Sequence, residues 1–354
     1  MIKKLFFSII ILLFVNAINA QQNNTFLWRI TNPANRQPSY LFGTIHLPQE
    51  KFMQLTDSVY CAVNNTDFFY GELDYSNVYK EMSDDDGFFQ SKLDYLDSVK
   101  KTVGWKRMIT SINRTYNVSI NPDSLDQFNK FGQDLLANYV EAEPGVTGLD
   151  AALSSYAMVL GKTTKGLETF KFQINMLYKI IDARLTDTTL LFDDDIRLTT
   201  NLKRFYSNQQ FDSLSAIIES INVTYRKIVF DNRNFSMADS IKNISADKTA
   251  FFAVGCGHLL GKNGIINLLK EKGLQLSPVF SSNKLSITLL ESIFKTGIDN
   301  VKKQLKKEKT VTDTEVMPDE KIEEIKEDWQ ISTAPAKKSP AKKVVVKKMA
   351  KTKK

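Results

Sequence analysis

Short runs of apolar and β-branched residues, closed by turn-forming residues, alternate along the chain with longer stretches whose apolar residues recur at helical spacing. The short runs predict strands at 25–31, 40–47, 67–74, 162–168, 250–257 and 274–280. The helical spacing predicts helices at 57–63, 150–160, 193–221, 225–244 and 264–270. Strands that alternate with helices are typical of an α/β fold.

The order of these elements contains two strand–helix–strand units, one at 40–74 and one at 250–280. A strand, a crossover helix and a parallel strand form a right-handed unit, and we expect the two strands of the first unit to be neighbours. The residues between the units predict a helical insertion over about 76–160 and a helical region over about 170–245. The predicted fold is therefore α/β, with a mixed sheet built from two strand–helix–strand repeats and a large helical insertion.

A long amphipathic helix is predicted to begin near residue 170. Its apolar stripe consists of Ile174, Leu177, Tyr178 and Ile181. Spacings of three and four residues place these side chains on one face of a helix, so we interpret the stripe as core and not as a cofactor contact.

Both ends of the chain differ in character from the predicted domain, which we place at 21–282. Two lysines, an apolar run over 5–15 and small residues at 17 and 20 are typical of a signal peptide over 1–20, so we expect an exported protein, periplasmic or secreted. No later apolar stretch reaches the roughly 20 residues that span a bilayer. An amphipathic helix is predicted over 283–306, and the charged, lysine-rich segment 307–354 lacks a core-forming pattern and is expected to be disordered.

The net charge of +7 comes from the C-terminal tail, because residues 337–354 contain nine lysines and no acid. The remaining 336 residues carry a net charge of −2. A nucleic-acid-binding surface on the domain is therefore not expected. The tail itself is a candidate for contact with acidic cell-surface polymers or an anionic membrane.

The two histidines of the chain, His46 and His258, each follow a predicted strand in the motif Gly-x-x-His. Ligands of α/β sheets collect at the carboxyl ends of the strands, where we expect both imidazoles. Glu72 is expected at the same edge, at the end of the strand after His46. The alternative for each histidine is a hydrogen bond to a neighbouring loop.

The chain resembles the TraB/GumN family, which is related to the Tiki metalloproteases, over about residues 25–282. The two Gly-x-x-His motifs are accompanied in order by Leu27-Trp28-Arg29-Ile30, Gly71-Glu72-Leu73-Asp74, Gly166-Leu167-Glu168-Thr169, Arg233-Asn234 and Pro278-Val279. The resemblance implies an α/β core with two repeats and the metal-dependent peptidase activity of the Tiki branch. It also implies functional roles for His46, Glu72, Glu168, Arg233 and His258.

Two imidazoles and a carboxylate are a sufficient ligand set for a divalent metal such as Mn, Co or Zn. We assign His46 and His258 as ligands, and Glu72 as either the third ligand or the general base, with Glu168 in the remaining role. Arg233 is a candidate for holding a substrate carboxylate or a developing oxyanion, and its alternative is a structural ion pair with a helix acid.

The chain contains two cysteines, Cys61 and Cys256. Our preferred interpretation is that both are small buried hydrophobic residues. The alternatives are a single disulfide bridge in an oxidising compartment, and Cys256 as a soft metal ligand.

Three hypotheses on function follow from these features. The first is an exported metal-dependent hydrolase, a peptidase with peptide or protein substrates. The second is a non-catalytic protein that binds a peptide or an iron compound. The third is a scaffold that docks through its lysine-rich tail.

Overall fold

The computed structural model describes residues 25–35, 37–45, 57–75, 77–84, 86–140, 149–190 and 192–280. The predicted signal peptide, His46, the helix predicted over 283–306 and the lysine-rich tail lie outside these residues, and they stay predictions.

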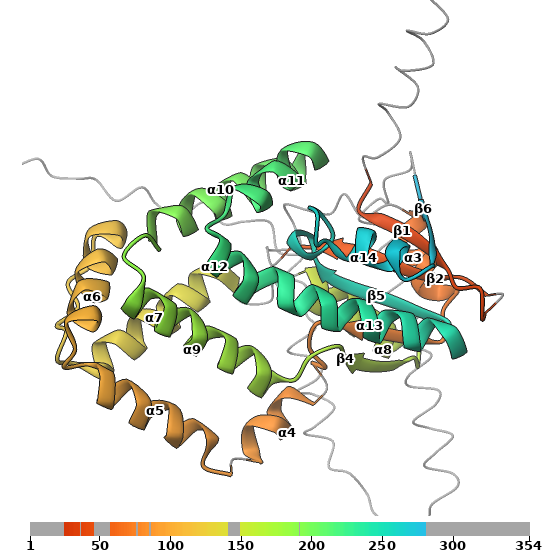
Figure 1. The fold of residues 1–354 in the computed structure, drawn as a ribbon. Helices are drawn as coiled ribbons and strands as arrows, with labels where there is room; N and C mark the ends of the chain where they lie inside the picture. Colours follow the sequence, from red (N-terminus) through yellow and green to blue (C-terminus); the bar gives the residue numbers. More distant parts are fainter. Residues whose placement is uncertain are drawn as a thin grey trace, which may run out of the picture. The chain divides into compact units, whose positions relative to one another are not determined.

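A mixed six-stranded sheet forms the right-hand part of the molecule in Figure 1. Its strands are β1 (Leu27–Thr31), β2 (Ser39–Thr44), β3 (Phe68–Gly71), β4 (Thr163–Gly166), β5 (Ala250–Gly255) and β6 (Gln275–Pro278). They lie in the order β4-β3-β5-β2-β1-β6. The first four strands in this order run parallel, while β1 is antiparallel to both β2 and β6. The prediction of an α/β fold with a mixed sheet is confirmed.

The prediction that the two strands of the first unit are neighbours is wrong, because β5 lies between β2 and β3. The sequence of β5 explains its central position. Its residues from Ala250 to Val254 are all fully buried, and such a strand is stable only where both faces of the sheet are covered. The strands β2, β3 and β5 are still parallel, so their carboxyl ends lie at one edge of the sheet.

The two strands of the second unit are not neighbours either. Its strand β6 runs parallel to β5, but β2 and β1 lie between them. The two strand–helix–strand units are therefore interleaved in one sheet and do not form two separate halves.

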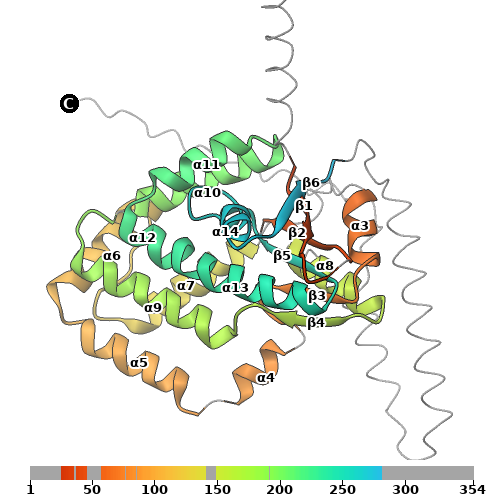
Figure 2. The ribbon, with the colours of Figure 1, turned by 45° about the vertical axis from the view of Figure 1, so that its right-hand side comes forward.

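Helices cover both faces of the sheet. Successive side chains of β5 point to opposite faces and contact different layers of helices. Phe251 packs into a cluster with α3 (Asp57–Asn64), α8 (Leu149–Val159) and α11 (Phe211–Ser220). Phe252 points to the opposite face and packs with α13 (Asn232–Asp247) and α14 (Ile265–Glu271). Figure 2 shows α13 and α14 on one side of the sheet and α3 on the other.

The helical insertion has a hydrophobic core of its own. The insertion comprises α4 (Val78–Ser83), α5 (Phe88–Val99), α6 (Val103–Tyr116) and α7 (Leu125–Val140). Residues of α5, α6 and α7 form the core together with α9 (Phe170–Thr186), and α4 also contacts α9. Trp105 is fully buried at its centre. The predicted stripe on α9 is partly wrong, since Leu177 is 49% exposed and Leu185 packs in the core with Tyr178 and Ile181.

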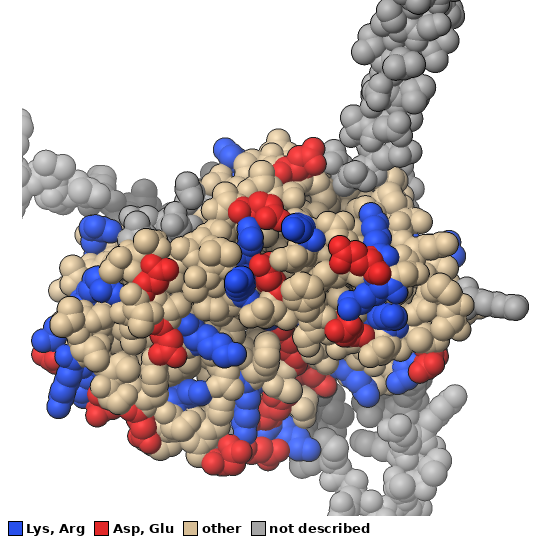
Figure 3. Space-filling model, viewed as in Figure 1, with Lys and Arg blue, Asp and Glu red and all other residues tan. Residues whose placement is uncertain are grey.

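The remaining helices link the insertion to the sheet. They are α10 (Phe192–Ser207), α11, and a continuous segment made of α12 (Val223–Arg226), a π-helical turn (Lys227–Asp231) and α13. Among the described residues, no helix combines the length and hydrophobicity that a membrane span requires. Basic and acidic side chains are interspersed on the face of the molecule shown in Figure 3.

Candidate functional site

Two glutamates lie side by side where the parallel strands β3 and β4 end. The ladder between these strands continues past Gly71 and Gly166, because the amide of Glu168 donates to the carbonyl of Glu72 at 2.9 Å. Glu72 and Glu168 therefore lie near each other, one and two residues after the glycines that close their strands.

These glycines are required by close backbone contacts. A Cβ atom on Gly166 would lie 2.7 Å from the amide nitrogen of Asp74 and 2.6 Å from the carbonyl oxygen of Glu168. A Cβ atom on Gly71 would lie 2.9 Å from the carbonyl oxygen of Leu73. Only glycine lets the two turns pack together, and this packing brings the glutamates to one place.

Arg233 of α13 joins the two carboxylates. Its Nε and Nη2 atoms donate to the two oxygens of Glu168 at 2.8 and 2.7 Å, and Nη2 also donates to Oε2 of Glu72 at 2.8 Å. Its Nη1 atom donates to the carbonyl of Val229, within the π-helical turn, at 3.1 Å. The pair of hydrogen bonds from Nε and Nη2 to Glu168 is bidentate, which is the strongest arrangement between an arginine and a carboxylate.

Gln173, in the first turn of α9, reinforces this arrangement. Its amide nitrogen lies 3.3 Å from Oε2 of Glu72 and 3.1 Å from Oε2 of Glu168. Thr169 caps the helix by accepting a hydrogen bond from the amide of Phe172, which fixes the start of α9 next to Glu168.

The second oxygen of Glu72 faces strand β5 and the residues that follow it. Oε1 accepts a hydrogen bond from the amide of Gly255 at 2.7 Å and lies 3.6 Å from Nε2 of His258. The other ring nitrogen of His258, Nδ1, lies 2.6 Å from Oδ1 of Asn234. The ring of Phe230 meets the imidazole edge to face, with centroids 5.2 Å apart.

The cluster formed by Glu72, Glu168, Arg233 and His258 is buried, with side chains only 5% to 10% exposed. Burial opposes the charged form of Arg233, but its hydrogen bonds to Glu168 and the charge of Glu72 outweigh burial and raise its pKa above the ordinary value. Two carboxylates share one guanidinium, so the cluster favours an additional positive charge next to Glu72.

The spacing of His258 and Glu72 fits a divalent metal. Two donors that bind one tetrahedral zinc ion at about 2.0–2.2 Å lie about 3.4 Å apart, and the distance between Nε2 of His258 and Oε1 of Glu72 is 3.6 Å. Within the described part of the chain, no group of three or more His, Cys, Asp or Glu residues is placed to hold a metal ion.

Four of the predicted site residues converge in this cluster: Glu72, Glu168, Arg233 and His258. His46 lies outside the described residues, which end at Ile45 in this part of the chain. Arg233 is in an ion pair, as in the alternative interpretation, but its partners follow strands and do not belong to helices. Gln173 was not among the predicted site residues, and its only signal in the sequence is its place five residues after Glu168.

The cysteines do not form a bridge, since both are free. Cys256 is buried as expected, and burial raises the pKa of its thiol to about 12. The expectation that Cys61 is buried is wrong, because this residue is exposed on α3.

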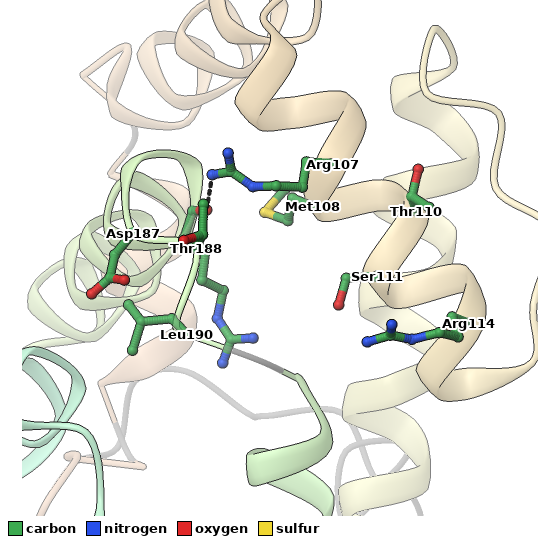
Figure 4. A pocket seen from close by; sticks show the side chains of 9 residues that line it. Arg107, Met108, Thr110, Ser111, Arg114, Asp187, Thr188 and Leu190 are labelled. Atoms are coloured by element: carbon green, nitrogen blue, oxygen red, sulfur yellow. Dashed lines mark hydrogen bonds between the residues drawn. The ribbon is translucent and has the colours of Figure 1, made fainter.

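A separate cavity of about 290 Å³ lies in the helical insertion, between α6 and the segment after α9 (Figure 4). Its lining includes Arg107, Arg114, Arg184, Ser111 and Asp187. The side chain of Arg107 donates to the carbonyls of Arg184 and Leu185, and thereby caps the C-terminus of α9. Of the predicted site residues that the structure describes, none lines this cavity.

Comparisons with known proteins agree with the resemblance seen in the sequence. The model of the TraB/PrgY/gumN family matches residues 26–278. A protein described as "Metalloprotease TIKI homolog" from Amphimedon queenslandica is 23% identical over 331 residues, with 76% of this chain and 63% of that protein covered. "Metalloprotease TIKI2" from Danio rerio is 21% identical, with 73% and 62% covered. "Metalloprotease TIKI1" from Xenopus tropicalis is 24% identical, with 71% and 61% covered.

The chain thus spans less than two thirds of the length of these relatives. No solved structure matches it.

Proposed function

The chain belongs to the TraB/PrgY/gumN family, and on this premise we propose that it is an exported metal-dependent hydrolase that acts as a peptidase on peptides or proteins. One observation carries the proposal: the imidazole of His258 and the carboxylate of Glu72 meet at the carboxyl edge of the sheet at a distance that suits two ligands of one metal ion. The distant metalloprotease relatives support the same class of reaction.

We propose that His258, Glu72 and His46 hold the metal. The strand β2 pairs with β5 through Thr44 and Gly255, and His46 follows Thr44 by two residues in the sequence. The two Gly-x-x-His motifs therefore follow neighbouring parallel strands. Imidazole and carboxylate donors suit Zn, Mn or Co.

In this proposal the surrounding residues fix the carboxylate of Glu72. Its Oε2 atom accepts from Arg233 and Gln173, and its Oε1 atom accepts from the amide of Gly255, so that Oε1 stays directed towards His258. We assign Glu72 as a ligand. We assign Glu168 to holding Arg233, because both of its oxygens accept hydrogen bonds from that guanidinium.

A divalent metal supplies two effects when bound, since it lowers the pKa of water to about 7 and polarises a carbonyl group. The protein contributes the preorganised carboxylate and imidazole, which cost no reorganisation when charge develops during the reaction. Burial of the cluster strengthens these electrostatic interactions.

The same burial favours a second candidate, a non-catalytic member of the family that binds a peptide or an iron compound. Catalysis requires a substrate carbonyl to approach the metal, and the side chain of His258 is only 5% exposed. A protein that binds its ligand elsewhere would keep the cluster as a structural ion-pair network.

Metal analysis of the purified protein tests the proposal. We expect about one Mn, Co or Zn ion per chain by equilibrium dialysis, and loss of both binding and peptide hydrolysis in His258→Ala, Glu72→Ala and His46→Ala. The control is Cys61→Ala, at an exposed residue on α3, which should retain both. A wild-type protein that binds none of these metals contradicts the proposal. Saturable binding of a peptide or an iron compound that survives removal of metal and yields no product favours the second candidate.

A further inference from the structure

The side-chain amide of Asn234 has only one orientation that satisfies its neighbours. This residue is buried on α13, with 1% of its surface exposed. Its Nδ2 atom donates to the carbonyl of Asn263 at 2.8 Å, since a carbonyl oxygen can only accept. The Oδ1 atom of the amide must therefore face Nδ1 of His258, 2.6 Å away.

This orientation determines which nitrogen of His258 carries the proton. The Oδ1 atom of an amide has no hydrogen to donate, so the short contact is a hydrogen bond only if Nδ1 of the imidazole donates. In the neutral ring the other nitrogen, Nε2, then carries the lone pair, and this nitrogen lies 3.6 Å from Oε1 of Glu72.

The ring is also prevented from turning away. The edge of Phe230 packs against it at 61°, and Phe230 in turn lies so close to Gly257 that a Cβ atom there would be 2.6 Å from its ring. The imidazole is thus held by Phe230 and Asn234, with its Nε2 atom on the side of Glu72.

We propose that Asn234 is a positioning residue that fixes the tautomer of His258, so that the lone pair of Nε2 is directed towards the metal. The inference rests on the function proposed above. Asn234 touches neither substrate nor metal, and it acts through the imidazole alone. Partners of this kind typically change metal affinity about 10- to 100-fold when they are removed.

The first test reads the tautomer in metal-free protein, so that it is independent of metal binding and of activity. The chain has two histidines, and in the His46→Ala background a protein labelled with ¹⁵N-histidine gives signals from His258 alone. At a pH where the imidazole is neutral, we expect the Nδ1–H tautomer with Asn234 present. In Asn234→Leu, of similar size but without an acceptor, we expect this preference to be lost.

Two further variants separate the role of the acceptor from a general loss of structure. Asn234→Asp keeps an oxygen that accepts from Nδ1 and should retain the tautomer, although it loses the hydrogen bond to the carbonyl of Asn263. Asn232→Leu is the matched control, because Asn232 lies on the same helix but is exposed. Thermal unfolding followed by circular dichroism checks that each variant is folded.

The second test measures the dissociation constant for Zn and Mn in the chain that retains His46. We expect Asn234→Leu to bind about 10- to 100-fold more weakly than wild type, and Asn234→Asp and Asn232→Leu to stay near wild type. If wild type binds no metal, the proposed function fails while the tautomer measurement still stands. If wild type binds and folded Asn234→Leu keeps both the tautomer and the affinity, the positioning role is refuted.

Discussion

The substitution Arg233→Met removes the one guanidinium that two buried carboxylates share. Methionine fills part of the space of the arginine side chain but donates no hydrogen bond. Glu72 and Glu168 would then lie next to each other at the strand ends, where Gln173 and the amide of Gly255 still donate to them.

The structure gives the size of the expected loss. Three hydrogen bonds from Arg233 to carboxylates disappear, with lengths of 2.7 to 2.8 Å, and all three side chains are at most 10% exposed. Removal of one partner of a buried ion pair costs about 3–5 kcal/mol, because the remaining charges stay buried without compensation. We expect a loss of about 3–5 kcal/mol in the free energy of unfolding.

Urea unfolding at pH 7, in the presence of a chelator, measures this loss. The matched control is Lys130→Met, because Lys130 and Asp134 form an exposed ion pair on α7 with side chains 76% and 60% exposed. That pair contributes about 0–1 kcal/mol, so the control should change stability little.

A double-mutant cycle with Glu168→Gln separates the ion pair from simple loss of packing. Most of the predicted loss comes from the carboxylates that are left behind, so Arg233→Met should cost less when Glu168 is already neutral. We expect a coupling of about 1–3 kcal/mol. A loss below about 1 kcal/mol for Arg233→Met, or additive effects in the cycle, would refute our account of the cluster as a buried and mutually dependent charge network.

Three further predictions follow from particular contacts. Gly166→Ala should destabilise the protein by about 1–3 kcal/mol in urea unfolding, because its Cβ atom would clash with backbone atoms, whereas Gly132→Ala, with open space around it on α7, should be neutral or stabilising by about 0.5–1 kcal/mol. Burial raises the pKa of Tyr206 well above its ordinary value of 10.0, so the stability that its hydrogen bond to the carbonyl of Gly43 contributes is present below pH 10 and is lost as the pH rises beyond that value. The advantage of wild type over Tyr206→Phe, about 1 kcal/mol at pH 7, should therefore shrink in unfolding experiments above pH 10, and a constant difference would contradict this. Deletion of 337–354 should abolish co-sedimentation with anionic vesicles at low salt, and unchanged partitioning would exclude a docking role for the tail.

Much of the sheet edge is predictable from local patterns. The residues before Glu72 and His258 form apolar runs closed by glycine, and such runs place strand ends within a few residues of their observed positions. The strand order is not predictable in this way, because the central position of β5 depends on which strand is buried on both faces in the assembled sheet. The exposure of Leu177 on α9 likewise depends on how the helices of the insertion pack.

The partners of the site residues are harder to predict than the residues themselves. Arg233 was identified as a candidate from the sequence, but its contact with Glu168 joins residues that are 65 positions apart. Asn234 follows Arg233 in the sequence, yet its two contacts reach His258 and Asn263 through the packing of α13 against the end of β5. Such contacts depend on tertiary structure and leave no periodic signal in the sequence.

The interleaved strand order has a consequence for the site that two separate repeats would not provide. Because β5 of the second unit is inserted between β2 and β3 of the first, the amide of Gly255 reaches Glu72 directly and His258 lies next to the same carboxylate. If β2 and β3 were neighbours, as the order of the chain suggests, the strand that leads to His258 could not pair with both of them. The candidate site therefore requires both units within one sheet, and we infer that neither unit forms the site alone.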